Sequence, residues 1–203
     1  MSTARVIKYV AGAYRTNVYL VYDEETKEAF IVDPGYEFPK IYDDIQTFGL
    51  KPMYILLTHG HGDHTGGIGL LKKTYPDIKL IASAKERKFL YNRSFSLGKG
   101  GIRADIEVSD GDELEIGNIR LKFISTPGHT PGGMCILMDD ILFSGDTLFR
   151  MSVGRTDLPG GDEEALLSSI KDKLMILPDE TVVLPGHMEE TTIGIERRYN
   201  PFV

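Results

Sequence analysis

The stretch from Thr58 to Gly67 reads Thr-His-Gly-His-Gly-Asp-His-Thr-Gly-Gly and places three histidines and an aspartate within six residues. It directly follows the apolar run from Met53 to Leu57, which has the pattern of a buried strand. Nitrogen and oxygen donors packed this densely are costly to bury without a partner, so the pattern predicts a metal ion. We expect Gly60 and Gly62 to let the chain turn tightly, because a helix or regular strand would not gather these side chains.

The two remaining histidines, His129 and His187, stand in similar surroundings. His129 follows Thr-Pro-Gly and His187 follows Pro-Gly, each after an apolar run, and Asp146 also ends a strand-like run. A single histidine in a polar loop is more often a hydrogen-bonding side chain than a ligand. Because all five histidines of the chain lie in such loops, the pattern as a whole favours a metal site.

Length and composition are those of a globular protein of one or two domains. With 203 residues, 41% of them hydrophobic, the chain can bury one sizeable core, and we expect residues 1–203 to form a single domain. The net charge of -7 disfavours a nucleic-acid partner. Cys135 is the one cysteine and lies in an apolar run, which excludes an internal disulfide and indicates a core position. The oligomeric state stays open.

The sequence carries no feature of export or membrane insertion. The N-terminal residues lack the apolar centre of a signal peptide, and no 18 apolar residues run together. We therefore expect a cytoplasmic protein with no membrane partner.

The order of periodic segments predicts two β-sheets packed face to face, with helices outside and the histidine loops at one edge. Strands are expected over 5–10, 16–22, 29–32, 53–57, 78–82, 107–109, 113–116, 119–125, 133–138, 141–144 and 181–184. Helices are expected over about 38–48, 67–75, 83–91 and 162–177.

Two local features have two interpretations each. Asp33, in an Asp-Pro-Gly turn, is either a turn former or a carboxylate that orients the histidine loop. A group of cations around residues 85–103 either attracts an anionic substrate or forms an ordinary solvated helix face and loop, which is the favoured interpretation. These cations are Lys85, Arg87, Lys88, Arg93, Lys99 and Arg103.

Seven residues in this order, together with the Asp33-Pro34-Gly35 turn, resemble the metallo-β-lactamase superfamily over nearly the whole chain. They are His59, His61, Asp63, His64, His129, Asp146 and His187. The resemblance implies an α/β fold, the αββα sandwich of two mixed β-sheets with outer helices. This agrees with the arrangement expected from the periodic segments.

The resemblance also implies a ligand set for two divalent metal ions. One ion would be held by His59, His61 and His129, the other by a second triad, and Asp146 would bridge them. The second triad is Asp63, His64 and His187. Zinc is the expected metal, with iron or manganese as alternatives. Ions about 3.5 to 4 Å apart can share a hydroxide that acts as the nucleophile, and Asp63 and Asp146 are then the catalytic carboxylates that hold it and the metals.

Further motifs select a branch of the superfamily. True β-lactamases usually carry cysteine or serine where this chain has Asp146 and are exported, and flavin-linked di-iron members carry glutamate where it has His61. The segments 144–149, 154–157 and 196–202 are similar to glyoxalase II-like thioester hydrolases, especially the short bacterial type. The resemblance thus implies hydrolysis of a small anionic thioester such as S-lactoylglutathione.

The sequence departs from typical glyoxalase II in two places. A third consecutive histidine is replaced by Gly60, and only residues 188–203 follow His187, where glyoxalase II continues into a helical domain that holds glutathione. We expect glutathione to be recognised loosely. Arg150 and Arg155, just past Asp146, either anchor a substrate carboxylate or form salt bridges that hold their loop, with equal weight.

Other functions use the same residues. A persulfide dioxygenase-like oxidoreductase with one iron is the main alternative, because two histidines and a carboxylate also form a non-haem iron site. A phosphodiesterase or nuclease of the superfamily is disfavoured by the acidic charge. A non-catalytic binding module is least favoured, because an open polar metal site has no evident structural purpose.

Overall fold

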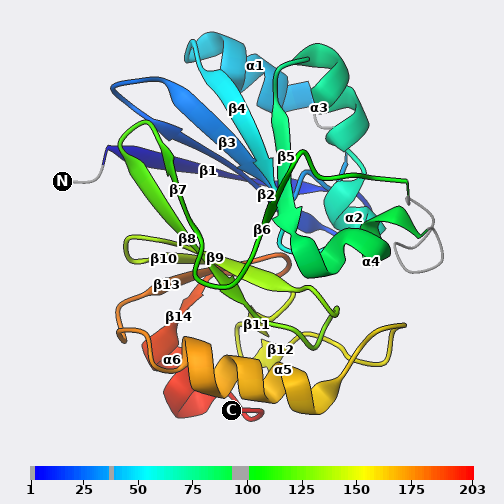
Figure 1. Ribbon diagram of the computed structural model, residues 1–203. Helices are drawn as coiled ribbons and strands as arrows, with labels where there is room; N and C mark the ends of the chain where they lie inside the picture. Colours follow the sequence, from blue (N-terminus) through cyan, green and yellow to red (C-terminus); the bar gives the residue numbers. More distant parts are fainter. Residues whose placement is uncertain (1–2, 37–38, 93–100) are drawn as a thin grey trace.

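The computed structural model describes residues 3–36, 39–92 and 101–203 and contains two six-stranded sheets packed face to face (Figure 1). The strands of the first sheet lie in sequence order. They are β1 (Ala4–Ala11), β2 (Thr16–Asp23), β3 (Glu28–Val32), β4 (Lys51–Leu56), β5 (Lys79–Ser83) and β6 (Ile106–Val108). The pairs β1–β2 and β2–β3 are antiparallel and the pairs from β3 to β6 are parallel, so the sheet is mixed.

The second sheet has the strand order β14-β13-β10-β9-β8-β7 and is also mixed. Its strands are β7 (Glu113–Ile116), β8 (Ile119–Ser125), β9 (Met134–Met138), β10 (Ile141–Gly145), β13 (Val182–Pro185) and β14 (Thr191–Thr192). Only β10 and β13 are parallel neighbours, since the chain crosses over between them. A separate hairpin joins β11 (Leu148–Phe149) to β12 (Ser152–Val153).

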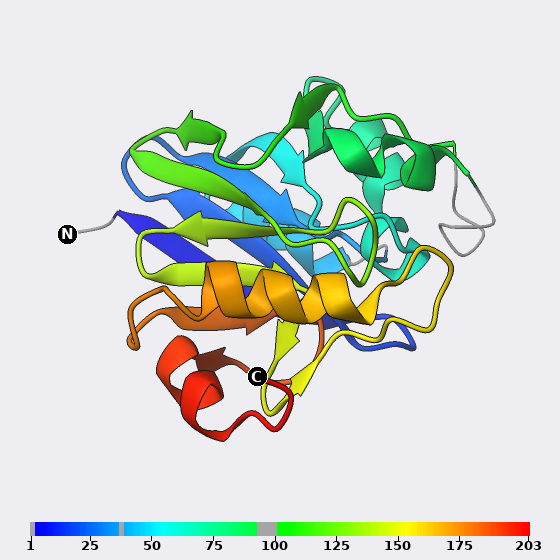
Figure 2. The ribbon, with the colours of Figure 1, turned by 60° about the horizontal axis from the view of Figure 1, so that its bottom comes forward.

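Helices cover the outer face of each sheet. The first sheet carries α1 (Pro39–Thr47), α3 (Ile68–Thr74), the short 3-10 turn η1 (Ala84–Glu86) and α4 (Arg87–Tyr91). The second carries α5 (Glu163–Ser169), which continues as the π-helical turn η2 (Ile170–Leu174), and α6 (Ile193–Tyr199). Figure 2 shows α5 and η2 lying over the second sheet, roughly along the direction of its strands.

Apolar side chains form three layers of contact, as four stacked layers of structure require. In β3, Phe30 and Val32 face the other sheet, whereas Ala29 and Ile31 face the helices, which explains why this strand is apolar from Ala29 to Val32. The layer between the second sheet and its helices contains Cys135, which is fully buried as expected. The predicted αββα sandwich of two mixed sheets is confirmed.

The strands agree with the sequence prediction to within about two residues, but several short elements were not predicted. They are α2 (Gly62–Thr65), the β11–β12 hairpin, β14 and α6. These elements have two to seven residues, too few for a periodic pattern to stand out. Among the described residues, no helix is long and apolar enough to cross a bilayer.

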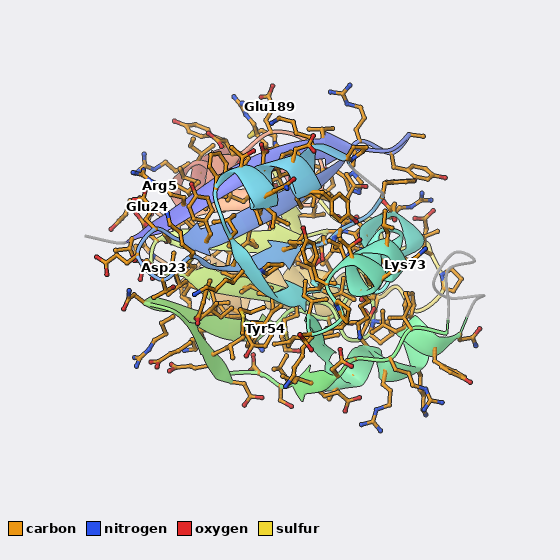
Figure 3. The ribbon with its side chains drawn as sticks, turned by 90° about the horizontal axis from the view of Figure 1, so that it is seen from above. Arg5, Asp23, Glu24, Tyr54, Lys73 and Glu189 are labelled. Carbon is orange, nitrogen blue, oxygen red and sulfur yellow. The ribbon has the colours of Figure 1, made fainter. Side chains whose placement is uncertain are left out.

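Asp23 links the two sheets at the end shown on the left of Figure 3. One carboxylate oxygen accepts hydrogen bonds from the N–H groups of Glu25 and Thr26, at 2.7 and 3.0 Å, within the β2–β3 turn. The other accepts from the N–H of Asn118 at 2.7 Å, in the β7–β8 turn of the second sheet. Burial raises the pKa of Asp23, but these backbone donors outweigh burial and lower the pKa to about 2.

We expect Asp23→Ala to lower the free energy of unfolding by about 2 kcal/mol, because three N–H groups in partly buried hydrogen bonds lose a charged acceptor. Because the folded-state pKa is depressed, this contribution is present above about pH 4 and is lost as the pH falls toward the folded-state pKa. Urea denaturation at pH 7 and pH 3 measures both effects. The adjacent Glu24, whose contact is an exposed ion pair with Arg5, provides the control: Glu24→Ala should change stability by less than about 0.5 kcal/mol.

Candidate metal centre

The seven predicted ligand residues meet at one end of the two sheets. His59 and His61 follow β4, and α2 carries Asp63 and His64. The other three follow strands of the second sheet, and they are His129 after β8, Asp146 after β10 and His187 after β13. Both sheets therefore contribute to the cluster, and each contribution comes from a loop or short helix at a strand end.

The first group of donors consists of His59, His61 and His129. Their nearest ligand atoms all lie within 4.8 Å of one another, and His61 Nδ1 lies 2.9 Å from His129 Nε2. All three side chains are buried, with 2 to 4% of each residue exposed.

The second group consists of Asp63, His64 and His187, whose ligand atoms also lie within 4.8 Å of one another. His187 Nε2 lies 3.3 Å from Asp63 Oδ2 and 3.3 Å from His64 Nε2. His64 is fully buried, whereas Asp63 and His187 are partly exposed. This group is therefore the one that opens toward solvent.

Asp146 lies between the two groups. Its Oδ1 is 3.4 Å from His64 Nε2, and its Oδ2 is 3.5 Å from the Nε2 atoms of both His129 and His187. One carboxylate thus contacts members of both groups, as a bridging ligand must.

The donor set fits divalent cations. Two ligand atoms that share a tetrahedral zinc ion at 2.0 to 2.1 Å lie roughly 3.3 Å from each other, and the contacts given above run from 2.9 to 3.5 Å. His59 Nε2 and Asp146 Oδ1 are buried and have no hydrogen-bond partner among the described residues. Buried polar atoms without partners are rare, and a bound cation would satisfy both of these.

Four histidines are oriented by a hydrogen bond on the Nδ1 side of the ring. Each Nδ1–H has an oxygen partner, and its Nε2 lone pair is then left for the centre. The partners are Thr58 Oγ1 for His59 at 3.1 Å, Asp33 Oδ2 for His64 at 3.0 Å, the Arg155 carbonyl for His129 at 2.7 Å and the Tyr14 carbonyl for His187 at 3.1 Å. His61 is reversed, since its Nδ1 faces His129 and its buried Nε2 has no partner among the described residues.

Asp33 orients the histidine loop, which is the second of the two interpretations that the sequence left open. Its φ of 50° places it in the left-handed region, but residues 33–35 form no hydrogen-bonded turn. Its carboxylate accepts hydrogen bonds from the N–H and the hydroxyl of Thr58, at 2.8 and 2.6 Å, and pairs with His64 Nδ1. Asp33 therefore orients His64 of the second group and holds Thr58, the residue that precedes His59 of the first group.

The electrostatics of the cluster favour cation binding. Burial, with repulsion from the other histidines, lowers the pKa of His59 well below 6.5 and that of His61 to about 4, so both offer neutral imidazole at pH 7. Burial opposes protonation of His64 and His187 too, but Asp146 and the neighbouring carboxylates outweigh it and raise these pKa values to about 9 and about 10. The same carboxylate field attracts a metal ion.

Residues 11–187 match the family described as "Metallo-beta-lactamase superfamily". The chain belongs to this superfamily. It is thus a member of a metallo-hydrolase superfamily, and the His and Asp cluster indicates that it binds divalent metal ions.

Several curated proteins resemble this superfamily member along most of their length. Probable metallo-hydrolase YqgX of Bacillus subtilis is 39% identical, over 95% of this chain and 94% of its own. Hydroxyacylglutathione hydrolase GloC of Haemophilus influenzae is 36% identical over 94% of each chain. The human mitochondrial persulfide dioxygenase ETHE1 is 32% identical over 92% of this chain and 70% of its own.

Two crystal structures are similar to this metallo-β-lactamase fold in both sequence and shape. BLEG-1 B3 metallo-beta-lactamase is 37% identical with a TM-score of 0.89, over 98% of this chain and 99% of its own. TTHA1623, in a di-iron-bound form, is 36% identical with a TM-score of 0.85, over 98% of this chain and 100% of its own. The relatives thus include proteins named for different reactions and one structure with iron.

The prediction that Gly60 and Gly62 form tight turns was wrong. Neither residue has a positive φ, and Gly62 begins helix α2. Gly60 is instead needed for close packing, because a Cβ there would lie 2.9 Å from Leu90 Cδ2 and 3.1 Å from Phe89 Cδ1. The short helix, starting directly after His61, delivers Asp63 and His64 to the second group.

Arg150 and Arg155 lie near the metal loops, and both side chains are exposed and paired. Arg150 contacts Glu189 at 2.6 Å, and Arg155 forms a two-pronged contact with Asp157, each bond 2.7 Å long. The carbonyl of Arg155 orients His129, a role that does not depend on its side chain. A role in substrate binding stays a prediction for both arginines.

The cations around residues 85–103 are only partly within the described chain, because Arg93 and Lys99 lie outside it. Arg87 pairs with Glu107, and Arg103 lies over the ring of Tyr91 at 5.2 Å. These contacts are typical of the solvated-face interpretation, which the sequence already favoured.

Several residues that hold the centre were not identified from sequence. Thr58 and the carbonyls of Tyr14 and Arg155 orient histidines, and Asn17 Nδ2 donates to the carbonyls of Pro185 and Met188 on either side of His187, at 2.8 and 2.9 Å. Every residue has a backbone carbonyl, so the sequence cannot show which carbonyl orients a histidine. Thr58 adjoins the histidine motif and could have been found from that position.

We expect the purified chain to contain close to two divalent ions, and we expect Asp146→Ala to lose most of the metal and the activity, because both donor groups lose a shared carboxylate. Elemental analysis after gel filtration measures the stoichiometry. The matched control is Asp140→Ala, an exposed aspartate in the β9–β10 turn, which should leave the metal content unchanged. A single tightly held iron that added zinc does not alter would contradict the two-ion site.

Proposed function

We propose that this superfamily member hydrolyses small anionic thioesters such as S-lactoylglutathione, using two divalent ions that are zinc in the active enzyme. The observation that carries the proposal is the pair of three-donor groups joined by Asp146. The similarity to GloC over 94% of both chains supports the thioester substrate class.

His59, His61 and His129 would hold one ion, and Asp63, His64 and His187 the other, with Asp146 in contact with both. When bound, such ions polarise a carbonyl and lower the pKa of a water molecule to near neutrality. The partly exposed second group is where substrate would enter, because His187 and Asp63 retain solvent contact. The fixed Nδ1 partners keep the imidazoles in place while the substrate binds.

A thioester suits the residues of the site better than an amide does. A thiol leaving group has a pKa near 8.5 and departs as thiolate without a side chain to protonate it. Burial acts to raise the pKa values of Asp63 and Asp146, the carboxylates of the proposed ligand set, but their histidine neighbours outweigh it and lower them. Both therefore remain ionised and cannot donate a proton at pH 7.

Persulfide dioxygenation is the second candidate, favoured by the 32% identity to human ETHE1. Two histidines and a carboxylate with open positions also suit one iron(II) ion, and either donor group could supply part of such a set. β-Lactam hydrolysis is included in the test because of the similarity to BLEG-1.

The first kinetic prediction concerns reaction class and glutathione selectivity. We expect kcat/KM for S-lactoylglutathione to exceed that for a small thioester lacking the glutathione carboxylates by no more than about tenfold. The reason is that Arg150 and Arg155, the cations placed near the loops, are already paired with Glu189 and Asp157. Thiol release by the zinc-loaded protein measures both rates.

The same protein is also assayed for the two competing reactions, persulfide dioxygenation and β-lactam hydrolysis. Oxygen consumption with glutathione persulfide by the iron-loaded chain, or hydrolysis of a chromogenic β-lactam, at rates well above thioester turnover would overturn the proposal. A preference of a thousandfold or more for S-lactoylglutathione would leave the hydrolase standing and contradict loose recognition.

The second kinetic prediction tests the two arginines. If one anchors a substrate carboxylate, Arg150→Ala or Arg155→Ala should raise KM roughly tenfold, as expected for the loss of a charged hydrogen bond. Their partners provide matched controls, because Glu189→Ala and Asp157→Ala free each arginine and should leave KM equal or lower. Unchanged KM with a lowered Tm in the arginine variants would instead assign the ion pairs to holding the loops.

A further inference from the structure

Glu86 is a buried carboxylate beside the metal loops that plays no part in the proposed ligand set. It ends η1 and precedes α4, a position at which a glutamate is ordinarily solvated. Here 1% of the residue is exposed. Exposure to solvent at a helix surface therefore does not explain why a glutamate stands at this position.

The carboxylate links two segments of backbone that come from different sheets. Its Oε1 accepts a hydrogen bond from the N–H of Gly60 at 2.9 Å, and its Oε2 accepts one from the N–H of Gly132 at 2.8 Å. Gly60 stands between His59 and His61, and Gly132 lies three residues after His129. One side chain thus joins the two loops that supply the whole first donor group.

Both glycines make this close approach possible. A Cβ at Gly132 would collide with the backbone nitrogen and the carboxylate of Glu86. A Cβ at Gly60 would lie 3.2 Å from Glu86 Oε1, closer than ordinary packing allows. The loops are therefore shaped around the carboxylate.

No lysine, arginine or histidine is paired with Glu86 within the part of the chain that the structure describes. Burial raises the pKa of this carboxyl to about 7, with the backbone donors acting in the opposite direction. A buried acid without a counter-ion is unfavourable for stability relative to an apolar side chain. Packing alone thus does not account for a glutamate here. The two hydrogen bonds do, because they need one acceptor oxygen for each of two N–H groups.

We propose that Glu86 is a positioning residue that sets the spacing of the His59–His61 and His129 loops and thereby the affinity of the first donor group for its metal ion. This deepens the proposed function and rests on its metal site, but not on the identity of the substrate. Glutamine in its place keeps one acceptor and turns an NH₂ group toward an N–H, so one of the two loops is released.

The test measures metal affinity in the two groups separately. Chelator-treated protein is titrated with Zn²⁺ alone, in competition with a chromophoric chelator, in two backgrounds. His187→Ala leaves the first group complete, and His61→Ala leaves the second complete. We expect Glu86→Gln to weaken Zn²⁺ binding by about 10- to 100-fold in the His187→Ala background, and by less than about threefold in the His61→Ala background.

Glu196 offers a matched control for the loss of a buried carboxylate. It is fully buried and accepts hydrogen bonds from the Met151 N–H, the Thr191 hydroxyl and the Asn200 amide, none of them on a metal loop. Glu196→Gln should lower the Tm yet change Zn²⁺ affinity by less than about threefold in both backgrounds.

Equal losses of affinity in the two backgrounds, or no loss in the His187→Ala background, would overturn the proposal. If circular dichroism shows that Glu86→Gln does not fold, Glu86→Asp, which withdraws the carboxylate by one methylene, is judged by the same criteria. Because Zn²⁺ affinity is read without any substrate, a failure of thioester hydrolysis leaves this result interpretable.

Discussion

Lone pairs of buried imidazole and carboxylate groups face one another where the two sheets end, and this arrangement is unfavourable without a cation between them. The fold maintains it by fixing the far side of each ring. Asp33 holds His64 at 3.0 Å, and the Arg155 carbonyl holds His129 at 2.7 Å. The fold thus orients the donors through groups that lie outside the ligand set.

The scaffold itself is held together by links between the sheets next to the centre. The N–H of Met134, at the start of β9, donates to the Thr58 carbonyl at 2.9 Å, and the N–H of Asn17 on β2 donates to the Gly186 carbonyl at 2.7 Å. Each link joins a strand of one sheet to a metal loop of the other. Rigid strands thus position loops that would otherwise vary, which is the requirement for a site that needs sub-ångström placement.

A donor cluster of this kind does not determine the reaction. Relatives along most of this chain are named as a hydroxyacylglutathione hydrolase and a persulfide dioxygenase, and one similar structure is in a di-iron-bound form. Metal identity and the groups that contact the substrate beyond the metals must separate these activities. In this chain the nearby cations Arg150 and Arg155 already have carboxylate partners, so a substrate carboxylate would have to displace Glu189 or Asp157 to contact either arginine.

The sequence by itself predicted the layered fold from strand periodicity and a metal site from the histidine motif, because both are local properties of the chain. The full set of seven ligands followed from its resemblance to the metallo-β-lactamase superfamily. Only the tertiary structure decided that His61 presents Nδ1 while the other histidines present Nε2, and that Gly60 serves close packing instead of a turn. It also revealed the roles of the Arg155 carbonyl and of Glu86. These depend on which backbone groups from the opposite sheet approach a side chain, and no local pattern encodes that distance.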